Sequence, residues 1–374
     1  MKLALVRQRY TAFGGAERFV ERAIAALGRD DIEITLLTRH WSGAPAANLK
    51  LRKLDPFHIG RTWRDASFAR AVQHEITGGD YDLVQSHERV PGCDIYRAGD
   101  GSHLGWLTHR ARARGQRFDA RWCGPYHRYT LVAEAAMFRH PKLRAVICNS
   151  RFIQRELMDL FGLPEERLPL IENGVDLQRF RPASSLEKRD ARVALGLPPG
   201  APLLAFVGSG FERKGLAAVI ETLPRDAHLV VAGKDKSEPR YRRIAQRVGH
   251  SDRVHFLGPQ QDVAPIYRAA DGFVFPAVYE PFGNVVLEAM ACGLPAITSP
   301  SCGAESLIEH GRNGWLADAF ERESLRAALA ELMATIASPQ RLAAVASAAR
   351  STAERQTPER MADALVALYR RLLG

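Results

Sequence analysis

The sequence contains no apolar run that approaches the roughly 20 residues needed to cross a bilayer. Near the amino terminus, the apolar residues Leu3 to Val6 are followed at once by Arg7, so this segment is too short for a signal peptide. It predicts a first buried strand instead. We therefore expect any contact with a membrane to be peripheral and from one side only.

Cysteine is also scarce. The five cysteines of the 374-residue chain are scattered and form no C-x-x-C pair, which favours reduced thiols and gives no indication of a metal site. Low-complexity tracts are missing. With 46% hydrophobic and 25% charged residues, the composition is that of an ordinary globular protein and excludes the disordered and fibrous classes.

The length of the chain exceeds the size at which one hydrophobic core keeps growing, so two domains with a cleft between them are expected. Apolar runs alternate with helical patterns, which predicts an α/β fold with two Rossmann-like domains. We place the first domain at 1–168, the second at 169–350, and a C-terminal helix at 351–374 that could cross back to the first. The predicted strands are 3–6, 32–38, 81–85, 145–148, 203–207, 228–232, 253–257, 272–275 and 295–298.

The formal net charge of +10 indicates an anionic partner. Nucleic acid, a phosphorylated metabolite and an acidic membrane surface all fit this charge. The choice among them has to come from motifs.

The first motif is the glycine pair Gly14 and Gly15, between a predicted strand and a helix. Glycines at such a turn let backbone amides approach a phosphate, and the helix amino terminus favours negative charge. The pair is explained equally well by a turn that needs glycine only for its backbone conformation and binds no ligand.

The second motif follows the predicted strand 203–207. Gly208 ends the strand at the edge of the sheet where open α/β sheets bind ligands, and Arg213 and Lys214 precede the next helix. These two cations could neutralise a diphosphate, Arg213 through bidentate hydrogen bonds and Lys214 as a point charge. A solvated basic turn is the alternative.

The third motif contains two glutamates eight residues apart, Glu280 and Glu288. At helical spacing they would be ~12 Å apart, too far to share a proton, so we expect different roles. Glu280, in the loop ahead of a helix, can reach a sugar hydroxyl. Glu288, about one turn into the helix, can accept the hydroxyls of a ribose. Its apolar neighbours imply a buried partner.

Between the two glutamates, the backbone amides of Phe282, Gly283 and Asn284 are expected at the start of this helix, with Asn284 as its cap. Amides in this position favour an anionic ligand.

These segments resemble the signature of the retaining GT-B glycosyltransferases grouped as family 4. The resemblance is carried by the Glu280-x7-Glu288 segment, which continues as Ala-Met-Ala-Cys-Gly-Leu-Pro, by Glu-Asn-Gly-Val-Asp at 172–176, and by Phe-Glu-Arg-Lys-Gly at 211–215. It covers nearly the whole chain. Residues 13–18 and 90–96, ahead of Asp100, are similar to the members that add glucose to the first inner-core heptose of lipopolysaccharide.

The resemblance implies a role for each motif. Gly15 would contact the donor phosphate or the leaving sugar, and Arg213 and Lys214 would hold the diphosphate. Glu280 would engage the transferred sugar and Glu288 the ribose. Breaking the bond to the diphosphate leaves negative charge there, which cations and helix amino termini can stabilise. No metal or other cofactor is expected, and retention would follow from attack by the acceptor on the face that the diphosphate leaves.

Asp100 occupies the place where many relatives have a histidine near the reacting carbon, which leaves the polar group at the reaction centre open. His103 is close in sequence. A lone histidine in a loop is more often an ordinary surface residue than a catalyst.

The acceptor side is predicted from a basic, aromatic stretch at 97–128. This stretch could contact anionic lipid headgroups or phosphates of a lipopolysaccharide core. It would also suit binding of single-stranded nucleic acid. A third interpretation is a solvated charged helix whose aromatic residues lie in the hydrophobic core. The candidates for contact with the acceptor or membrane are His103, Arg110, Arg112, Arg114, Arg117 and Arg121.

Taken together, the motifs and the resemblance imply an enzyme that moves glucose from UDP-glucose to the inner-core heptose of lipopolysaccharide, with no nucleic-acid partner. It would be cytoplasmic and associate peripherally with the inner face of the cytoplasmic membrane. The alternatives are a related GT-B transferase with another nucleotide sugar or a lipid or exopolysaccharide acceptor, a sugar-nucleotide epimerase, and a Rossmann protein that binds anions or nucleic acid without catalysis.

Overall fold

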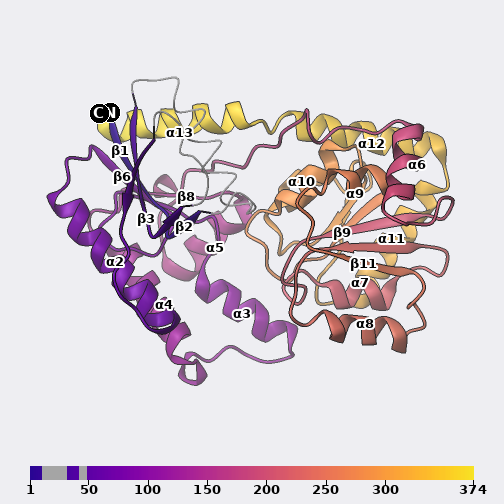
Figure 1. The fold of residues 1–374 in the computed structure, drawn as a ribbon, viewed down its shortest axis with the longest axis horizontal. Coiled ribbons are helices and arrows are strands. Elements are labelled where there is room, and N and C mark those ends of the chain that lie inside the picture. The colour runs from indigo at the N-terminus through magenta and orange to yellow at the C-terminus, as the bar shows by residue number, and fades with distance from the viewer. Residues whose placement is uncertain (11–31, 42–48) are drawn as a thin grey trace. The chain divides into compact units, whose positions relative to one another are not determined.

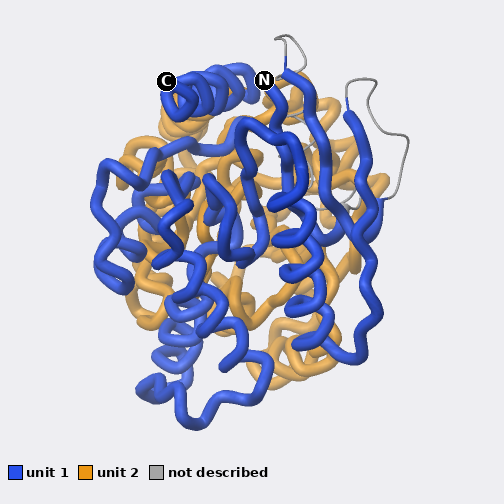
Figure 2. Tube along the Cα trace, turned by 90° about the vertical axis from the view of Figure 1, so that its left-hand side faces the viewer, with its two compact units in different colours: residues 1–174, 358–374 blue, residues 175–357 orange. Residues whose placement is uncertain are grey.

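The computed structural model describes residues 1–10, 32–41 and 49–374. It divides into two compact units (Figure 2). Unit 1 comprises Met1–Gly174 and Pro358–Gly374, and unit 2 comprises Val175–Thr357. The chain therefore leaves unit 1 after Gly174 and returns to it for its last helix.

Unit 1 is built on a six-stranded parallel sheet with the strand order β5-β3-β1-β6-β7-β8. In chain order this is 3-2-1-4-5-6, the arrangement of dinucleotide-binding folds. Figure 1 labels β1, β3, β6 and β8 of this sheet. A separate short pair is formed by β2 (Arg9–Tyr10) and β4 (His40–Trp41). The strands of the large sheet are β1 (Lys2–Val6), β3 (Glu33–Thr38), β5 (Leu49–Lys53), β6 (Leu83–Ser86), β7 (Ile95–Arg97) and β8 (Ala145–Ile147).

Both faces of this sheet are covered, which is why β1 has four consecutive buried residues. Leu3 and Leu5 pack with Leu365 and Tyr369 of the C-terminal helix in one apolar cluster. Alternate residues of β1 join a second cluster on the other face, with side chains of α2. The helices of unit 1 are α2 (Gly60–Gly78), α3 (His103–Ala113), α4 (Pro125–Arg139), α5 (Arg151–Phe161) and α13 (Pro358–Leu373), with short 3-10 helices η1 (Ala120–Trp122) and η2 (Glu165–Arg167).

Unit 2 repeats the same topology in a second parallel sheet, with the order β11-β10-β9-β12-β13-β14. Its strands are β9 (Leu203–Val207), β10 (His228–Ala232), β11 (Val254–Gly258), β12 (Gly272–Phe275), β13 (Ala296–Thr298) and β14 (Gly314–Leu316). Its helices are α6 (Ser185–Ala194), α7 (Leu216–Thr222), α8 (Glu238–Arg247), α9 (Ala264–Ala269), α10 (Asn284–Ala291), α11 (Arg322–Ile336) and α12 (Pro339–Glu354), with the 3-10 helix η3 (Gly303–Leu307).

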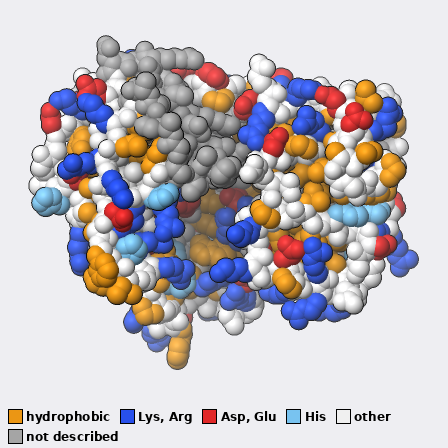
Figure 3. Space-filling model, viewed as in Figure 1, with side chains coloured by type: hydrophobic (Ala, Val, Ile, Leu, Met, Phe, Trp, Pro, Cys, Tyr) orange, Lys and Arg blue, Asp and Glu red, His pale blue; other side chains and the backbone are white. Residues whose placement is uncertain are grey.

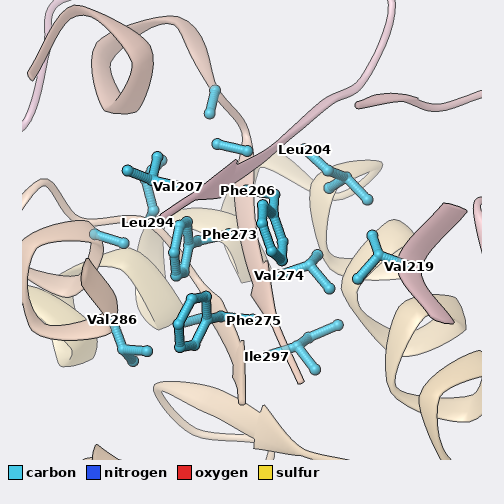
Figure 4. Close-up of a cluster of buried hydrophobic side chains, with 14 of the residues drawn as sticks. Leu204, Phe206, Val207, Val219, Phe273, Val274, Phe275, Val286, Leu294 and Ile297 are labelled. Atoms are coloured by element: carbon cyan, nitrogen blue, oxygen red, sulfur yellow. The ribbon is translucent and has the colours of Figure 1, made fainter. Parts of the chain in front are cut away.

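The core of unit 2 is aromatic at its centre (Figure 4). The ring of Phe275 lies 5.8 Å from that of Phe206 on β9 and 5.9 Å from that of Phe273 on its own strand, measured between ring centroids. Because these central strands are packed on both faces, their carboxyl ends are held rigidly where the loops of the site begin.

All nine predicted strands are present, with ends displaced by at most two residues. The sequence analysis missed β2, β4, β5, β7 and β14, which are short or strongly charged. No helix in the described ranges is long and apolar enough to cross a membrane. Figure 3 shows basic and acidic side chains interspersed over the face in view.

Candidate active site

The candidate donor site lies in unit 2 where the strand order reverses, between β9 and β12. In open α/β sheets, ligands bind beyond the carboxyl ends of the strands at this point. The segment after β9 carries Arg213 and Lys214, and the segment after β12 carries Glu280. The fold thus brings together the second and third sequence motifs.

Glu280 forms ion pairs with both cations. Its Oε2 atom lies 3.2 Å from Nζ of Lys214 and 3.2 Å from Nη1 of Arg213. The Glu280 side chain is only 15% exposed, and the Lys214 ammonium also lies 4.8 Å from the ring centroid of Phe275. Two positive charges and one negative charge leave this cluster with a net positive charge, which suits an anionic ligand.

The two segments are also joined through their backbones. The amide of Val278 donates to the carbonyl oxygen of Arg213 at 2.8 Å, and Nη1 of Arg213 donates to the carbonyl oxygen of Tyr279 at 3.1 Å. On its other side, Glu280 donates its amide to Ser301 at 2.9 Å and accepts from the amide of Gly303 at 2.8 Å. Glu280 is therefore fixed by its neighbours before any ligand binds.

The electrostatic setting keeps Glu280 ionised. Burial raises the pKa of this carboxyl, but the charges and hydrogen bonds of Lys214 and Arg213 outweigh burial, so that the pKa lies below its ordinary value. A sugar hydroxyl would meet a carboxylate that accepts hydrogen bonds.

Glycine is required at two positions around Lys214. Gly208 has a φ of +147°, and a Cβ atom there would lie 2.7 Å from Nζ of Lys214. Gly215 has a φ of +77°, and its Cβ would lie 2.2 Å from the carbonyl oxygen of Pro276. Both glycines keep space for the lysine and for the loop after β12.

The start of α10 differs from the prediction. Asn284 is the first helical residue, and the cap is Gly283, which has a φ of +94° and offers no side chain. A Cβ at Gly283 would lie 2.6 Å from Sγ of Cys302, so glycine is needed there for space as well as for conformation. Among the described residues, the backbone amides of Phe282 and Gly283 donate to no protein acceptor.

Glu288 lies one turn into α10 and is 5% exposed. Its predicted buried partner is Tyr267 of α9, whose hydroxyl donates to Oε2 of Glu288 at 3.1 Å. The same hydroxyl lies 3.3 Å from the carbonyl oxygen of Val285. Sequence reasoning missed Tyr267 because a tyrosine in a short amphipathic helix carries no signal of its own.

Two donor-site predictions, Gly14 and Gly15, fall outside the described residues. The described part of the chain holds no group of three or more His, Cys, Asp or Glu side chains with the geometry of a metal site.

Unit 1 has its own reversal of strand order, between β1 and β6. Beyond these strands, Nη1 of Arg7 lies 3.6 Å from Oδ2 of Asp100 and 3.7 Å from Oε1 of Glu88. The Asp100 side chain is 60% exposed, whereas burial raises the pKa of Glu88. The sequence analysis included Asp100 but missed Arg7 and Glu88, whose only signal was their position within two residues of the end of a strand.

His103 is not a loop residue. It begins α3 and is partly buried, with its Nε2 atom 2.9 Å from Nδ1 of His127. Burial, the charges of Arg89 and Arg110, and the neighbouring His127 lower the pKa of His103 to about 3. The imidazole is therefore neutral near pH 7, and its low basicity argues against a role as a general base.

The arginine-rich segment of unit 1 is largely exposed. Arg110 is partly buried and its guanidinium lies 5.6 Å from the ring of Trp106, whereas Arg112, Arg114, Arg117 and Arg121 are exposed. The aromatic residue Trp122 is 88% exposed, contrary to an assignment of the aromatics to the core.

A second exposed apolar group, which the sequence reading missed, lies at the start of α2. Phe57 is 73% exposed and Ile59 71% exposed. Arg61, in the same segment, stacks over the ring of Tyr126 of α4 at 4.3 Å and so connects this group to the arginine-rich segment. We call these two segments together the basic aromatic surface.

Comparison with known proteins identifies related families for both halves of the chain. The model described as "Glycosyltransferase Family 4" matches residues 13–179, and the model described as "Glycosyl transferases group 1" matches residues 187–349. The chain is 31% identical over 325 residues to the D-inositol 3-phosphate glycosyltransferases of Mycobacterium bovis and Mycobacterium tuberculosis. The match covers 79% of this chain but only 63% of the length of these relatives.

Solved structures share the fold over nearly the whole chain. The crystal structure of WaaG, a glycosyltransferase involved in lipopolysaccharide biosynthesis, is 25% identical with a TM-score of 0.81 and covers 96% of this chain and 98% of its own. HepE of Anabaena, solved in complex with UDP-glucose, is 22% identical with a TM-score of 0.73 and covers 98% of this chain and 100% of its own. Sucrose-phosphate synthase of Thermosynechococcus elongatus is 22% identical with a TM-score of 0.79, over 99% of this chain and 98% of its own.

Proposed function

The chain belongs to the family 4, group 1 glycosyltransferases with the GT-B fold, and from this premise we propose that it transfers glucose from UDP-glucose to the inner-core heptose of lipopolysaccharide. The reaction retains the anomeric configuration and needs no metal. One observation carries the proposal, namely the Glu280 carboxylate held between Arg213 and Lys214 at the strand reversal of unit 2.

The chemistry follows from where charge develops. The bond between C1 of the sugar and the diphosphate oxygen breaks, and its electron pair moves to the diphosphate. Arg213 and Lys214 stabilise this negative charge, together with the backbone amides of Phe282 and Gly283. The acceptor hydroxyl bonds to C1 on the same face, and its proton passes to the departing diphosphate.

Glu280 and Glu288 orient the donor. As a carboxylate, Glu280 accepts hydrogen bonds from hydroxyls of the transferred sugar. Glu288, oriented by Tyr267, accepts from the ribose hydroxyls. The choice of UDP-glucose is supported by the HepE complex with that compound, and the choice of lipopolysaccharide by the role of WaaG.

The acceptor is embedded in a membrane, so the enzyme has to reach it at the membrane surface. The basic aromatic surface supports peripheral binding to anionic lipids at the cytoplasmic face, because its arginines attract headgroups and exposed residues such as Trp122 and Phe57 suit the interfacial region. Flotation with anionic but not neutral liposomes at moderate salt tests this part of the proposal. Equal recovery with both would contradict it.

The test of the whole proposal is transfer by the purified protein across a panel of nucleotide sugars, with and without heptose-terminated core lipid. We expect UDP release from UDP-glucose that depends on the core lipid, and a product that retains the anomeric configuration. Release of the nucleoside diphosphate at equal rates from all donors, or no release with any acceptor, would reject it.

A phosphorylated small molecule is a second candidate acceptor. It is favoured by the 31% identity to the D-inositol 3-phosphate glycosyltransferases. The same panel, extended with inositol phosphates as acceptors, distinguishes the two, because only one acceptor class should stimulate UDP release. Stimulation by neither class, with nucleotide binding intact, would point to the non-catalytic alternative.

A further inference from the structure

The turn after Asp100 is held by a largely buried ion pair that takes no part in the donor site. Arg89, in the loop after β6, donates from Nε to Oε1 of Glu134 at 2.8 Å and from Nη2 to the carbonyl oxygen of Gly101 at 3.2 Å. Glu134 lies in the middle of α4 and is fully buried. One guanidinium therefore binds both α4 and the residue next to Asp100.

Glu134 also binds the amino terminus of α3. Its Oε1 atom accepts from the amide of His103 at 2.8 Å, and its Oε2 atom accepts from the amide of Leu104 at 3.2 Å. These amides belong to the first turn of the helix, where no partner within the helix exists, and the helix dipole favours a negative charge there. The first turn of α3 is thus capped by a carboxylate from α4.

The backbone of the turn leaves little room for rearrangement. Gly101 has a φ of +68°, a conformation that favours glycine. A Cβ atom at Gly105 would lie 1.9 Å from Oε1 of Glu156, which belongs to α5. The path from Asp100 into α3 is therefore enclosed by α4, α5 and Arg89.

We propose that Glu134 and Arg89 are positioning residues for Asp100. The pair ties the start of α3 to the carbonyl of Gly101 and so fixes the backbone that carries the Asp100 carboxylate. Because α3 also carries the partly buried Arg110 and the exposed Arg112 of the basic aromatic surface, an anionic partner that engages α3 acts on the placement of Asp100 through this pair. The inference rests on the proposed function and on the expectation from the sequence that Asp100 lies near the reacting carbon.

The experiment compares Glu134→Gln and Arg89→Lys with the wild type. Glutamine preserves the size of the Glu134 side chain but removes its charge. Lysine preserves the charge of Arg89 but lacks the planar guanidinium that donates to both Glu134 and the carbonyl oxygen of Gly101. Steady-state UDP release from UDP-glucose with core lipid gives kcat and KM, and hydrogen exchange by mass spectrometry follows the amides of residues 101–105. Asp271→Asn is the control, since it breaks another largely buried pair, with Arg192, in unit 2.

We expect kcat to fall about tenfold or more in both variants, because a small misplacement of a reacting group has a large effect on rate. KM for UDP-glucose should stay within about twofold, since the donor site is untouched. Exchange at residues 101–105 should become faster. Asp271→Asn should change neither kcat nor this exchange.

A double variant separates positioning from a merely structural role. If Glu134 acts through Asp100, then Glu134→Gln has no further effect on kcat in an Asp100→Asn background. Equal fold losses in both backgrounds would overturn the inference, as would unchanged exchange at residues 101–105. If the wild type releases no nucleoside diphosphate from any nucleotide sugar, the proposed function fails, while the exchange measurement still decides whether the pair fixes the turn.

Discussion

The ammonium nitrogen of Lys214 lies 3.2 Å from the Oε2 atom of Glu280, although the two residues follow different strands of the unit 2 sheet. The distance is set by the backbone contacts that join the two segments, so the charges are in place before a donor arrives. Such preorganisation favours catalysis because charged groups need not reorganise as the reaction proceeds.

Replacing Glu280 with glutamine should lower kcat for the proposed glucose transfer by about 100-fold, because the sugar loses a charged acceptor and the two cations lose their counter-ion. The measurement is UDP release at saturating donor. The variant Glu238→Gln, which removes an acid paired with Arg242 on α8, serves as the control and should remain active. A loss of less than about threefold in Glu280→Gln would contradict the assigned role.

The same variant tests the titration of Glu280. Its pKa is lower in the folded chain than the unfolded value of about 4.3, so ionised Glu280 stabilises the fold above that pH, and the contribution disappears as the pH falls through the folded pKa. The difference in melting temperature between wild type and Glu280→Gln should be constant above about pH 5 and shrink below about pH 4. A difference that grows in acid would have the wrong sign.

Replacing Gly208 with alanine should reduce transfer more than it reduces stability, because the new methyl group would displace the Lys214 side chain. Gly210→Ala is the matched control. Gly210 also has a positive φ, but a Cβ there meets nothing within 4 Å, so both variants carry backbone strain of about 1–3 kcal/mol. Equal activity of the two variants at equal stability would show that the position of Lys214 is unimportant.

Replacing Tyr267 with phenylalanine should destabilise the fold by about 1–3 kcal/mol, because buried Glu288 loses a hydrogen-bond donor. UDP affinity, measured by calorimetry, should fall with it, since Glu288 is no longer held in one orientation. Tyr241→Phe provides the comparison. Tyr241 is just as buried, but its hydroxyl has no hydrogen-bond partner among the described residues, so its removal should affect UDP affinity little.

His103 should make the protein less stable in acid. Its folded pKa of about 3 lies below the unfolded value of about 6.5, so the unfolded chain binds the proton more readily, and stability is lost progressively as the pH falls between these values. The melting temperature of His103→Gln should therefore decline less steeply from pH 6.5 to 4 than that of the wild type. An equally steep decline in the variant and the wild type would contradict this assignment to His103.

The sequence predicts strand bounds correctly where a strand is a run of apolar residues buried on both faces of the sheet. Strands such as Leu203–Val207 and His228–Ala232 have the bounds predicted for them because each is a nearly continuous apolar run between polar turns. The edge strand Leu49–Lys53 was missed, since four of its five residues are exposed and three are basic. The predicted strands differ from the missed edge strand in their burial pattern rather than in the intrinsic β-propensity of their residues.

In the candidate site, the sequence indicated charges but not their partners. Glu280, Arg213 and Lys214 were each found from local motifs, yet their mutual contact depends on the strand order, which single motifs do not specify. Glu134 and Arg89 were missed for the same reason. They are 45 residues apart, and only the packing of α4 makes a pair of them.

The return of the chain to unit 1 for α13 has a consequence for biosynthesis. Leu3 and Leu5 leave the ribosome early, but the helix residues that cover them, Leu365 and Tyr369, are made only after the whole of unit 2. Unit 2 can therefore fold while one apolar face of the unit 1 sheet is still exposed. During synthesis, chaperones would be needed by the incompletely folded unit 1 rather than by unit 2.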